Sequence, residues 1–387
     1  MLQQPPASLR HSISRSQRRS RRLLLGLLTI CAAFLTGFGP PRLTDRELSP
    51  TRRLDSADLR ALLEAQNEPD ISAAALLVYD VDADGILYAR AMDEARPVAS
   101  LTKLMTALLV LEAGNLDAQV TIADDDLIGG AAMGLIAGDT LTVEELLWGL
   151  LVPSGNDAAM ALARHTAGSA AEFTAQMNAR ADELGLTASA FRNPHGLDES
   201  GHVSSAQDLL TLTRLAQEFP LFRTITATAA TTVGGYKLEN TNELLTTYAG
   251  TTGVKTGTTD LAGQCLIAEI TRDGHPLIIE VLGSRNRYED VRRLHAYYQA
   301  NYVWLNGDFR ALDLLNRLRD ESGTLWYMTA EGDAPQSLVA RGAYPGLQAY
   351  RRIERPAGSA WFAGMVVGVV EWRLGDQVVG RQRLILR

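Results

Sequence analysis

Ser100 and Lys103, three residues apart, are the first pair whose types and spacing suggest chemistry. Positions i and i+3 share one helix face, so the hydroxyl would lie beside the amine. A serine at a helix start is commonly an N-cap, but a capping box would place Glu or Gln three residues later, and the helix dipole disfavours a cation in the first turn. The same dipole and partial burial favour a neutral amine, which could act as a general base for the serine.

Lysine is rare in this chain, and its positions are therefore informative. Among 37 lysines and arginines only three are lysines, namely Lys103, Lys237 and Lys255. An amine can lose its proton or act as a compact point charge, whereas a guanidinium stays protonated. We therefore expect chemical roles for Lys103 and Lys255, while chance is enough to explain Lys237.

Two further motifs follow along the chain. Pro153-Ser-Gly-Asn156 lies in a predicted turn between helices, and Lys255-Thr-Gly257 begins a strand pattern that continues with Thr258. Taken alone, the first fits a loop with an N-cap and the second fits an edge strand with an outward lysine. A P-loop is excluded because the Gly-Lys-[Ser/Thr] spacing is missing. The ordered set Ser-x-x-Lys, Ser-Gly-Asn and Lys-Thr-Gly is far more specific than any one member.

These three motifs in this order resemble the penicillin-recognising serine enzymes. The surrounding residues narrow the resemblance to the low-molecular-mass D-alanyl-D-alanine carboxypeptidases over about residues 71–301, and the tail resembles that family's C-terminal domain more loosely. The segments that carry the resemblance are Pro97–Thr106, Ser154–Ala158, Asn193–Asp198, Gly253–Thr259 and Ala262–Cys265.

The resemblance implies catalytic roles for three positions. Ser100 would be the acylated nucleophile and Lys103 its base, and Ser154 would relay protons towards the leaving amine. Asn156 would hold the amide carbonyl of the substrate. No cofactor or metal is implied.

The resemblance also implies where the substrate carboxylate and the oxyanion would lie. Lys255 and Thr256 would meet the terminal carboxylate within a binding stretch that continues through Gly257 and Thr258. The backbone N–H groups of Ser100 and Thr258 would form the oxyanion hole. Arg287 resembles a family arginine near the carboxylate, with Arg285 as the weaker candidate.

The expected function is an exported serine D,D-carboxypeptidase that removes the terminal D-alanine from peptidoglycan stem peptides and is acylated by β-lactam antibiotics. A D,D-endopeptidase and a β-lactamase remain alternatives. One β-lactamase class deacylates through a glutamate after the second motif, and residues 191–198 lack that pattern. A binding module on a disabled scaffold is disfavoured by the intact Ser100, Lys103 and Lys255.

Other functional classes fit the sequence poorly. The net charge of −8 argues against nucleic-acid binding through a general basic surface. His195 and His202 accompany no Gly-x-Ser-x-Gly elbow and are expected to satisfy local hydrogen bonds. No dense His, Glu or Cys pattern indicates zinc. Cys31 and Cys265 cannot build a disulfide scaffold, and Cys265 fits a small core residue.

The first 38 residues indicate export. Residues 1–22 hold six arginines and no acid, and the apolar run Leu23–Phe38 follows. This pattern is typical of a signal peptide or an uncleaved signal anchor, and both remain open. The positive-inside rule then places the rest of the chain outside the cytoplasm, in the cell envelope, either tethered by its N-terminus or secreted. No amphipathic helix follows Leu384, so any membrane tether would be N-terminal.

The length of 387 residues, with 46% apolar and 21% charged residues, indicates more than one globular unit. We predict a linker over residues 39–69 with a short helix near Ser56–Gln66, a D,D-peptidase domain over residues 70–306, and a small β-rich domain over residues 307–387. Strands come first, helices in the middle and strands again. This order indicates an α+β fold, similar to serine β-lactamases and D,D-peptidases, with an antiparallel sheet and a helical subdomain.

The individual elements follow from periodicity and turn signals. A hairpin is expected from Ala73–Asp80 and Ile86–Ala91, and a helix after Pro97 ends at Gly114. Further helices are predicted at Val143–Val152, Asp157–Ala167, Ala170–Leu184, Ala206–Glu218 and Tyr288–Asn301. Further strands are predicted at Val254–Gly257, Gln264–Thr271, Pro276–Gly283, Gly323–Tyr327, Ser337–Val339, Met365–Leu374 and Gln377–Leu386.

Overall fold

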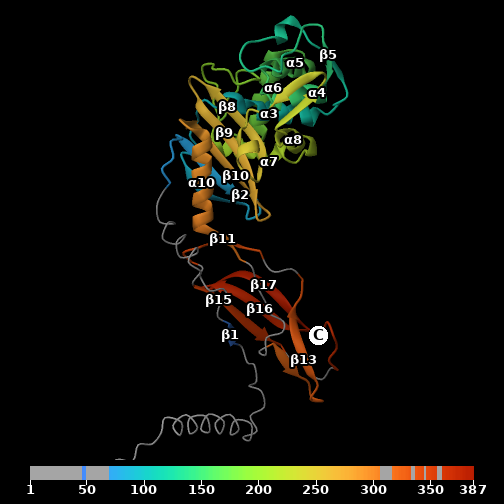
Figure 1. The fold of residues 1–387 in the computed structure, drawn as a ribbon, viewed down its shortest axis with the longest axis vertical. Helices are drawn as coiled ribbons and strands as arrows, with labels where there is room; N and C mark the ends of the chain where they lie inside the picture. The colour runs from blue at the N-terminus through green and yellow to red at the C-terminus, as the bar shows by residue number, and fades with distance from the viewer. Residues whose placement is uncertain (1–45, 49–68, 306–315, 333–335, 344–345, 355–359) are drawn as a thin grey trace, which may run out of the picture. The chain divides into compact units, whose positions relative to one another are not determined.

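The computed structural model describes residues 46–48, 69–305, 316–332, 336–343, 346–354 and 360–387 (Figure 1). The chain divides into two compact units, each described here by itself. The larger comprises residues 53–305 and 337–345, and the smaller comprises residues 1–52, 306–336 and 346–387. The leader over residues 1–38 and the helix predicted near residues 56–66 lie outside the described residues.

A five-stranded antiparallel sheet forms the frame of the larger unit. Its strand order is β3-β2-β10-β9-β8. The strands are β2 (Ala75–Asp80), β3 (Gly85–Arg90), β8 (Thr251–Thr259), β9 (Gly263–Arg272) and β10 (His275–Ser284). The first hairpin thus pairs with strands that follow almost two hundred residues later, which confirms the predicted α+β arrangement.

Each face of this sheet covers a separate hydrophobic core. Leu76, Val78 and Ile279 face the core that helix α10 (Arg287–Asn301) closes. Leu77 and Ile278 face the opposite core, which contains buried residues of helices from the middle of the chain. The alternation follows from the two-residue period of a strand. Figure 1 shows α10 on one side of the sheet and the helical group on the other.

The helical group lies between the first and last strands in sequence. The expected helix after Pro97 is divided into a short 3₁₀ turn, η1 (Ala99–Thr102), and α3 (Lys103–Ala113), which ends at Gly114. The other helices are α4 (Val143–Leu151), α5 (Asn156–Ala167), α6 (Ala170–Glu183), α7 (Ala206–Ala216), α8 (Pro220–Thr226) and α9 (Leu244–Thr247), with the 3₁₀ turn η2 (Asp124–Asp126). Thr142 and Glu145 form a capping box at α4, and Ser169 and Ser205 cap α6 and α7.

Three short strand pairs complete the larger unit, and the sequence pattern reveals none of them as a pair. They are β4 (Gln119–Thr121) with β5 (Thr140–Thr142), β6 (Ala230–Val233) with β7 (Tyr236–Glu239), and β11 (Tyr302–Trp304) with β14 (Leu338–Ala340). The last pair returns residues 337–345 to the larger unit after the chain has entered the smaller one.

The smaller unit is a six-stranded antiparallel sheet in the order β1-β15-β16-β17-β13-β12. Its strands are β1 (Arg46–Leu48), β12 (Arg317–Arg319), β13 (Leu325–Ala330), β15 (Leu347–Ile353), β16 (Val366–Leu374) and β17 (Gln377–Leu386). A turn with Gly375 at φ 56° joins β16 to β17. The expected C-terminal β domain is therefore present. Among the described residues, no helix is long and apolar enough to cross a membrane.

Candidate active site

The turn that carries Ser100 is held in an uncommon conformation. Ala99 has a φ of 50°, in the left-handed region that non-glycine residues seldom adopt. Thr102 Oγ1 donates to the Ala99 carbonyl at 2.8 Å and lies 2.7 Å from His202 Nε2. Gly196 packs so closely that a Cβ there would lie 2.1 Å from the Ala99 oxygen. The hydrogen bond from Thr102 and the close approach of Gly196 thus hold this strained turn in place.

Lys103 lies at the centre of a polar cluster although its side chain is fully buried. Its Nζ is 2.9 Å from Ser100 Oγ, 2.8 Å from Asn156 Oδ1 and 2.8 Å from the His195 carbonyl oxygen. Burial, and then the nearby charge of Lys255, lower the pKa of Lys103 well below its usual value. An amine with a lowered pKa within hydrogen-bond distance of a serine hydroxyl has the geometry of a general base, and the lowered pKa favours that role.

Ser154 and Asn156 lie at the start of α5. Ser154 has a φ of 64°, and its buried Oγ has no hydrogen-bond partner among the described residues. Asn156 accepts from Lys103 and donates through Nδ2 to the Gly129 carbonyl at 2.8 Å. A strained serine with an unsatisfied hydroxyl in a polar cluster is a feature that structural roles seldom explain.

Strand β8 passes directly beside the Ser100 turn because Gly257 has no side chain. A Cβ at Gly257 would lie 2.9 Å from the Val98 oxygen and 3.0 Å from the Ser100 nitrogen. Lys255 is 1% exposed, and its Nζ donates to the Thr256 carbonyl at 3.1 Å. Burial, and then the charge of Arg287, lower the pKa of Lys255 to about 7. Thr256 Oγ1 is 2.5 Å from Thr241 Oγ1.

Arg287 reaches β8 from the first turn of α10. Its Nη1 donates to the Gly257 carbonyl at 3.0 Å, to Thr258 Oγ1 at 2.7 Å and to the Cys265 carbonyl at 3.4 Å. These acceptors are all uncharged. For Arg285 only a backbone contact is seen, from its N–H to Ser72 Oγ at 3.1 Å. Of the two arginines considered from sequence, Arg287 is therefore the one that contacts the binding stretch.

The structure brings the sequence-predicted site residues together from four separate segments. Those residues are Ser100 and Lys103, Ser154 and Asn156, Lys255 to Thr258, and Arg287. Sequence reasoning missed the His195 carbonyl as a partner of Lys103 and the role of His202 beneath Thr102. His202 accepts the Arg192 N–H through Nδ1, and burial lowers its pKa to about 4.

Asp157, next to Asn156, was also missed. Its carboxylate accepts the N–H groups of Met133, Gly134 and Leu135 at 2.9, 2.9 and 3.1 Å and fixes the loop that borders the site. A buried aspartate in the first turn of a predicted helix is a signal that could have pointed to it.

The described residues contain no group of three His, Cys, Asp or Glu side chains placed to hold a metal ion. Cys265 is fully buried, as its interpretation as a core residue requires, and burial raises the pKa of its thiol to about 11. The site presents the Ser100 hydroxyl, the Lys103 amine with its lowered pKa, and the basic side chains of Lys255 and Arg287.

Comparison with known proteins gives consistent matches. Residues 63–286 match the family model Peptidase S11, described as D-alanyl-D-alanine carboxypeptidase. The chain is 36% identical over 226 residues to DacF of Bacillus subtilis, an alignment that covers 55% of this chain and 57% of that protein. It is 30% identical over 346 residues to DacC of Escherichia coli, covering 82% of this chain and 84% of that protein. Both relatives are named D-alanyl-D-alanine carboxypeptidases.

Solved structures give the same result. The Streptomyces K15 DD-transpeptidase matches with a TM-score of 0.56 and 33% identity, covering 60% of this chain and 99% of that one. Penicillin binding protein 5 from Haemophilus influenzae matches with a TM-score of 0.61 and 26% identity, covering 83% of this chain and 98% of that one. This chain therefore belongs to the D-alanyl-D-alanine carboxypeptidase family of serine-type peptidases.

Proposed function

We propose that this protein is an exported D,D-carboxypeptidase that removes the terminal D-alanine from peptidoglycan stem peptides through an acyl-enzyme on Ser100. The observation that carries the proposal is the 2.9 Å contact between Ser100 Oγ and a buried Lys103 amine, with two cations nearby. A peptide that ends in a free carboxylate needs a nucleophile, a base and a fixed positive charge, and the site offers all three.

The proposed reaction uses each cluster in turn. Ser100 Oγ attacks the carbonyl carbon of the penultimate D-alanine while Lys103 takes the serine proton. The N–H groups of Ser100 and Thr258 would stabilise the oxyanion that forms. When the C–N bond breaks, the proton passes by way of Ser154 to the leaving amine. Water then hydrolyses the ester, which restores Ser100 and releases the shortened peptide.

Binding of the substrate would rely on groups around β8. Asn156 would donate to the amide carbonyl, and Lys255, Thr256 and Arg287 would hold the terminal carboxylate. Within the described residues, Lys255 and Arg287 form no ion pair with a carboxylate, and their hydrogen-bond acceptors are backbone and hydroxyl oxygens. Buried charges are normally paired, so a substrate anion is the partner that this site lacks.

The location of the protein is part of the proposal. The basic leader and apolar run over residues 1–38 would export the chain and, if retained, tether it to the membrane. A variant starting near Leu43 behind a cleavable export signal should be released from membranes and remain active. Membrane association of that variant would show that another segment carries the anchor.

Mass spectrometry of a synthetic pentapeptide stem tests the activity. Loss of one D-alanine supports the proposal, cleavage of a cross-linked dimer instead would show an endopeptidase, and an unchanged peptide would overturn it. Labelling by fluorescent penicillin separates an enzyme from a binding module. The lifetime of the adduct then separates a peptidase, which holds it for long periods, from a β-lactamase, which releases it rapidly.

A further inference from the structure

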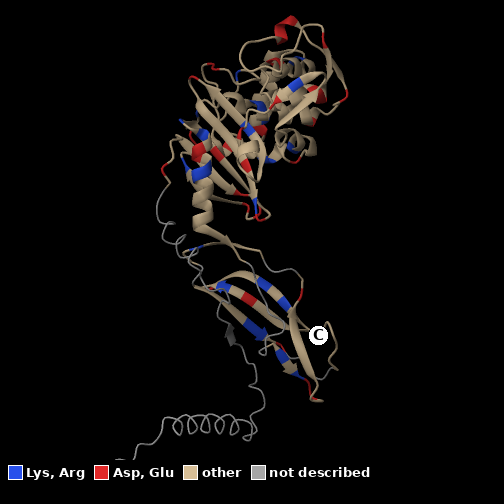
Figure 2. Cartoon of the chain, in the orientation of Figure 1, with Lys and Arg blue, Asp and Glu red and all other residues tan. Residues whose placement is uncertain are grey.

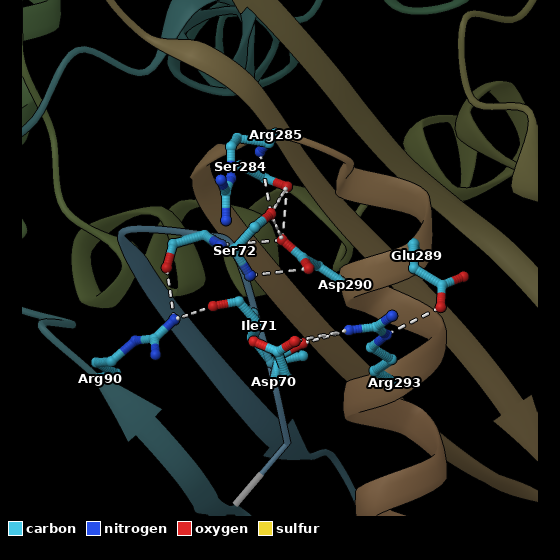
Figure 3. Close-up of polar contacts among 10 residues, drawn as sticks. Asp70, Ile71, Ser72, Arg90, Ser284, Arg285, Glu289, Asp290 and Arg293 are labelled. Atoms are coloured by element: carbon cyan, nitrogen blue, oxygen red, sulfur yellow. Dashed lines mark hydrogen bonds and ion pairs between the residues drawn. The ribbon is translucent and has the colours of Figure 1, made fainter.

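A buried carboxylate at the start of α10 joins three segments that are distant in sequence (Figure 3). Asp290 is 3% exposed and accepts four hydrogen bonds. Three come from the entry to β2: Ser72 N at 3.0 Å, Ser72 Oγ at 2.7 Å and Ala73 N at 2.9 Å. The fourth comes from Ser284 Oγ, at the end of β10, at 2.6 Å. All four donors are uncharged backbone N–H or serine hydroxyl groups.

The same network fixes the backbone that carries Arg287. Ser284 Oγ donates to Asp290 and accepts the Asn286 N–H at 3.0 Å, so one hydroxyl connects the carboxylate to the helix cap. Asn286 in turn caps the helix by accepting the Glu289 N–H at 3.2 Å. The Arg287 N–H donates to Gln264 Oε1 at 3.1 Å, and Gln264 pairs with Ser284 across β9 and β10. The Ser284 and Asn286 contacts connect the backbone next to Arg287 to the Asp290 carboxylate. Together with the Gln264 contact, they set the position of the Arg287 Cα.

Asp290 fixes the arginine without neutralising it. Among the described residues, the Arg287 guanidinium donates to two carbonyl oxygens and the Thr258 hydroxyl, and its Nε has no partner. The carboxylate of Asp290 instead binds the serine hydroxyls and backbone N–H groups one helical turn away. The charge of Arg287 thus stays available to an anion at β8.

We propose that Asp290 is a positioning residue that aims Arg287 at the terminal carboxylate of the substrate. The inference rests on the proposed function, because it assigns Asp290 to recognition of that carboxylate. An asparagine at this position would keep the size but present an NH₂ group to a set of donors. The cap at Asn286 would then shift, and a displacement of the order of 1 Å in a binding group can reduce turnover about 100-fold.

The test compares two peptides that differ only at their C-terminus, a pentapeptide acid and its C-terminal amide. In the full-length Asp290→Asn protein, kcat/KM for the acid should fall about 10-fold to 100-fold, mainly through KM, while the low value for the amide stays nearly constant. Ser284→Ala, which removes one of the four donors, should move the acid-to-amide ratio in the same direction by less. This milder variant keeps the test decisive if Asp290→Asn does not fold.

Two comparisons separate positioning from a general structural role. Asp208 is a matched control, since it is also a buried carboxylate in the first turn of a helix and accepts Ala188 N at 3.0 Å and Ser189 Oγ at 2.7 Å. Asp208→Asn should lower the Tm and leave the acid-to-amide ratio unchanged. In an Arg287→Ala background, Asp290→Asn should change the ratio no further, because the arginine it aims is gone.

The outcomes distinguish this inference from the proposed function. If the wild-type protein cleaves neither peptide, the proposed function fails and this inference fails with it. If the wild type prefers the acid, but Asp290→Asn leaves that preference intact or still changes it in the Arg287→Ala background, only the role of Asp290 is overturned.

Discussion

The basic side chains at the candidate site of the larger unit and those on the sheet of the smaller unit have different surroundings. In the smaller unit, Glu371 on β16 lies 2.5 Å from the guanidinium groups of both Arg373 and Arg381, and Arg383 lies 2.6 Å from Glu331. Figure 2 marks both basic and acidic positions along these strands. In the larger unit, the amines of Lys103 and Lys255 and the guanidinium of Arg287 lie at the candidate site, where their hydrogen-bond acceptors among the described residues include no carboxylate.

This difference separates charges that form ion pairs within the protein from charges that remain available to a ligand. In the smaller unit Arg373 and Arg381 are solvent-exposed, and an ion pair with an exposed partner contributes little to stability. A buried amine without a counter-ion is costly, and the pKa values of Lys103 and Lys255 fall for that reason. A protein is expected to retain such a destabilising amine at a site that binds a ligand or takes part in a reaction. The predictions below test this distinction.

The largest effect is expected from Ser100→Ala. Covalent labelling by fluorescent penicillin should disappear, because no other hydroxyl lies against Lys103 in the contacts described. The free energy of unfolding should change by about 1 kcal/mol or less, since the Ser100 side chain caps no helix. Retained labelling of the folded alanine variant would falsify the assignment.

Lys103→Arg should abolish acylation almost as completely, although it keeps the positive charge. A guanidinium stays protonated and cannot accept the serine proton. Stopped-flow acylation by a chromogenic β-lactam measures this directly, with circular dichroism and the Tm as folding controls. Lys237→Arg on β7 is the matched control and should acylate like the wild type. An acylation rate near wild type in Lys103→Arg would exclude Lys103 as the base.

Lys255→Ala should impair peptides that end in a free carboxylate far more than their C-terminal amides. Loss of one partner from a buried charge pair costs about 2–5 kcal/mol, and the amide has no such pair to lose. The measurement is kcat/KM for both substrates in both proteins. Equal losses for the acid and the amide would indicate that Lys255 has a general structural or acylation role. They would contradict the explanation that this arginine-rich chain has a lysine there to bind a carboxylate.

Much of the site could be predicted because its motifs are local. The i, i+3 spacing of Ser100 and Lys103 already implied adjacent side chains, and the order of strands, helices and strands indicated the α+β fold that the comparisons support. The structure adds that the serine lies in η1 and the lysine begins α3. The strand pattern around Lys255 indicated β8, although its full length from Thr251 to Thr259 was underestimated.

The contacts that depend on long-range packing could not be predicted. The His195 carbonyl reaches Lys103 across 92 positions of sequence, and no pattern in a single sequence encodes that distance. The resemblance favoured Arg287 over Arg285, but the acceptors of Arg287 depend on where β10 ends and on Asn286 as the helix cap, and a bulge near Ser284 alters that register. The return of β14 to the larger unit likewise depends on pairing with β11.

A smaller effect is expected when the pH is raised. The pKa of Lys255 is about 7, so below that pH the amine carries the charge that attracts a carboxylate, and above it the charge is lost. The acid-to-amide ratio of kcat/KM should therefore fall above pH 7, by at most about tenfold per pH unit. Titration of Lys103 affects both substrates and cancels in the ratio.

Two variants make this pH dependence specific to Lys255. Lys255→Arg should hold the ratio nearly constant between pH 7 and pH 9, because the guanidinium remains protonated. Arg287→Ala should move the decline to higher pH, since the charge of Arg287 is the second cause of the lowered pKa. A decline that is identical in all three proteins would assign it to another group.

The smallest effect is expected in the smaller unit, where Glu371→Gln removes the carboxylate that two exposed arginines share. Its hydrogen bond to Arg373, followed by the contact with Arg381, holds the pKa of Glu371 below its usual value. The contribution to stability is thus present at neutral pH and disappears as the pH falls through the lowered pKa of the folded state. At neutral pH the variant should lose about 0–1 kcal/mol of unfolding free energy, less at high salt, and should hydrolyse peptides like the wild type. Urea denaturation and pentapeptide turnover measure both quantities. A large loss of turnover would contradict the distinction between paired and unpaired cations, because a charge already compensated within the protein would then be needed for the reaction.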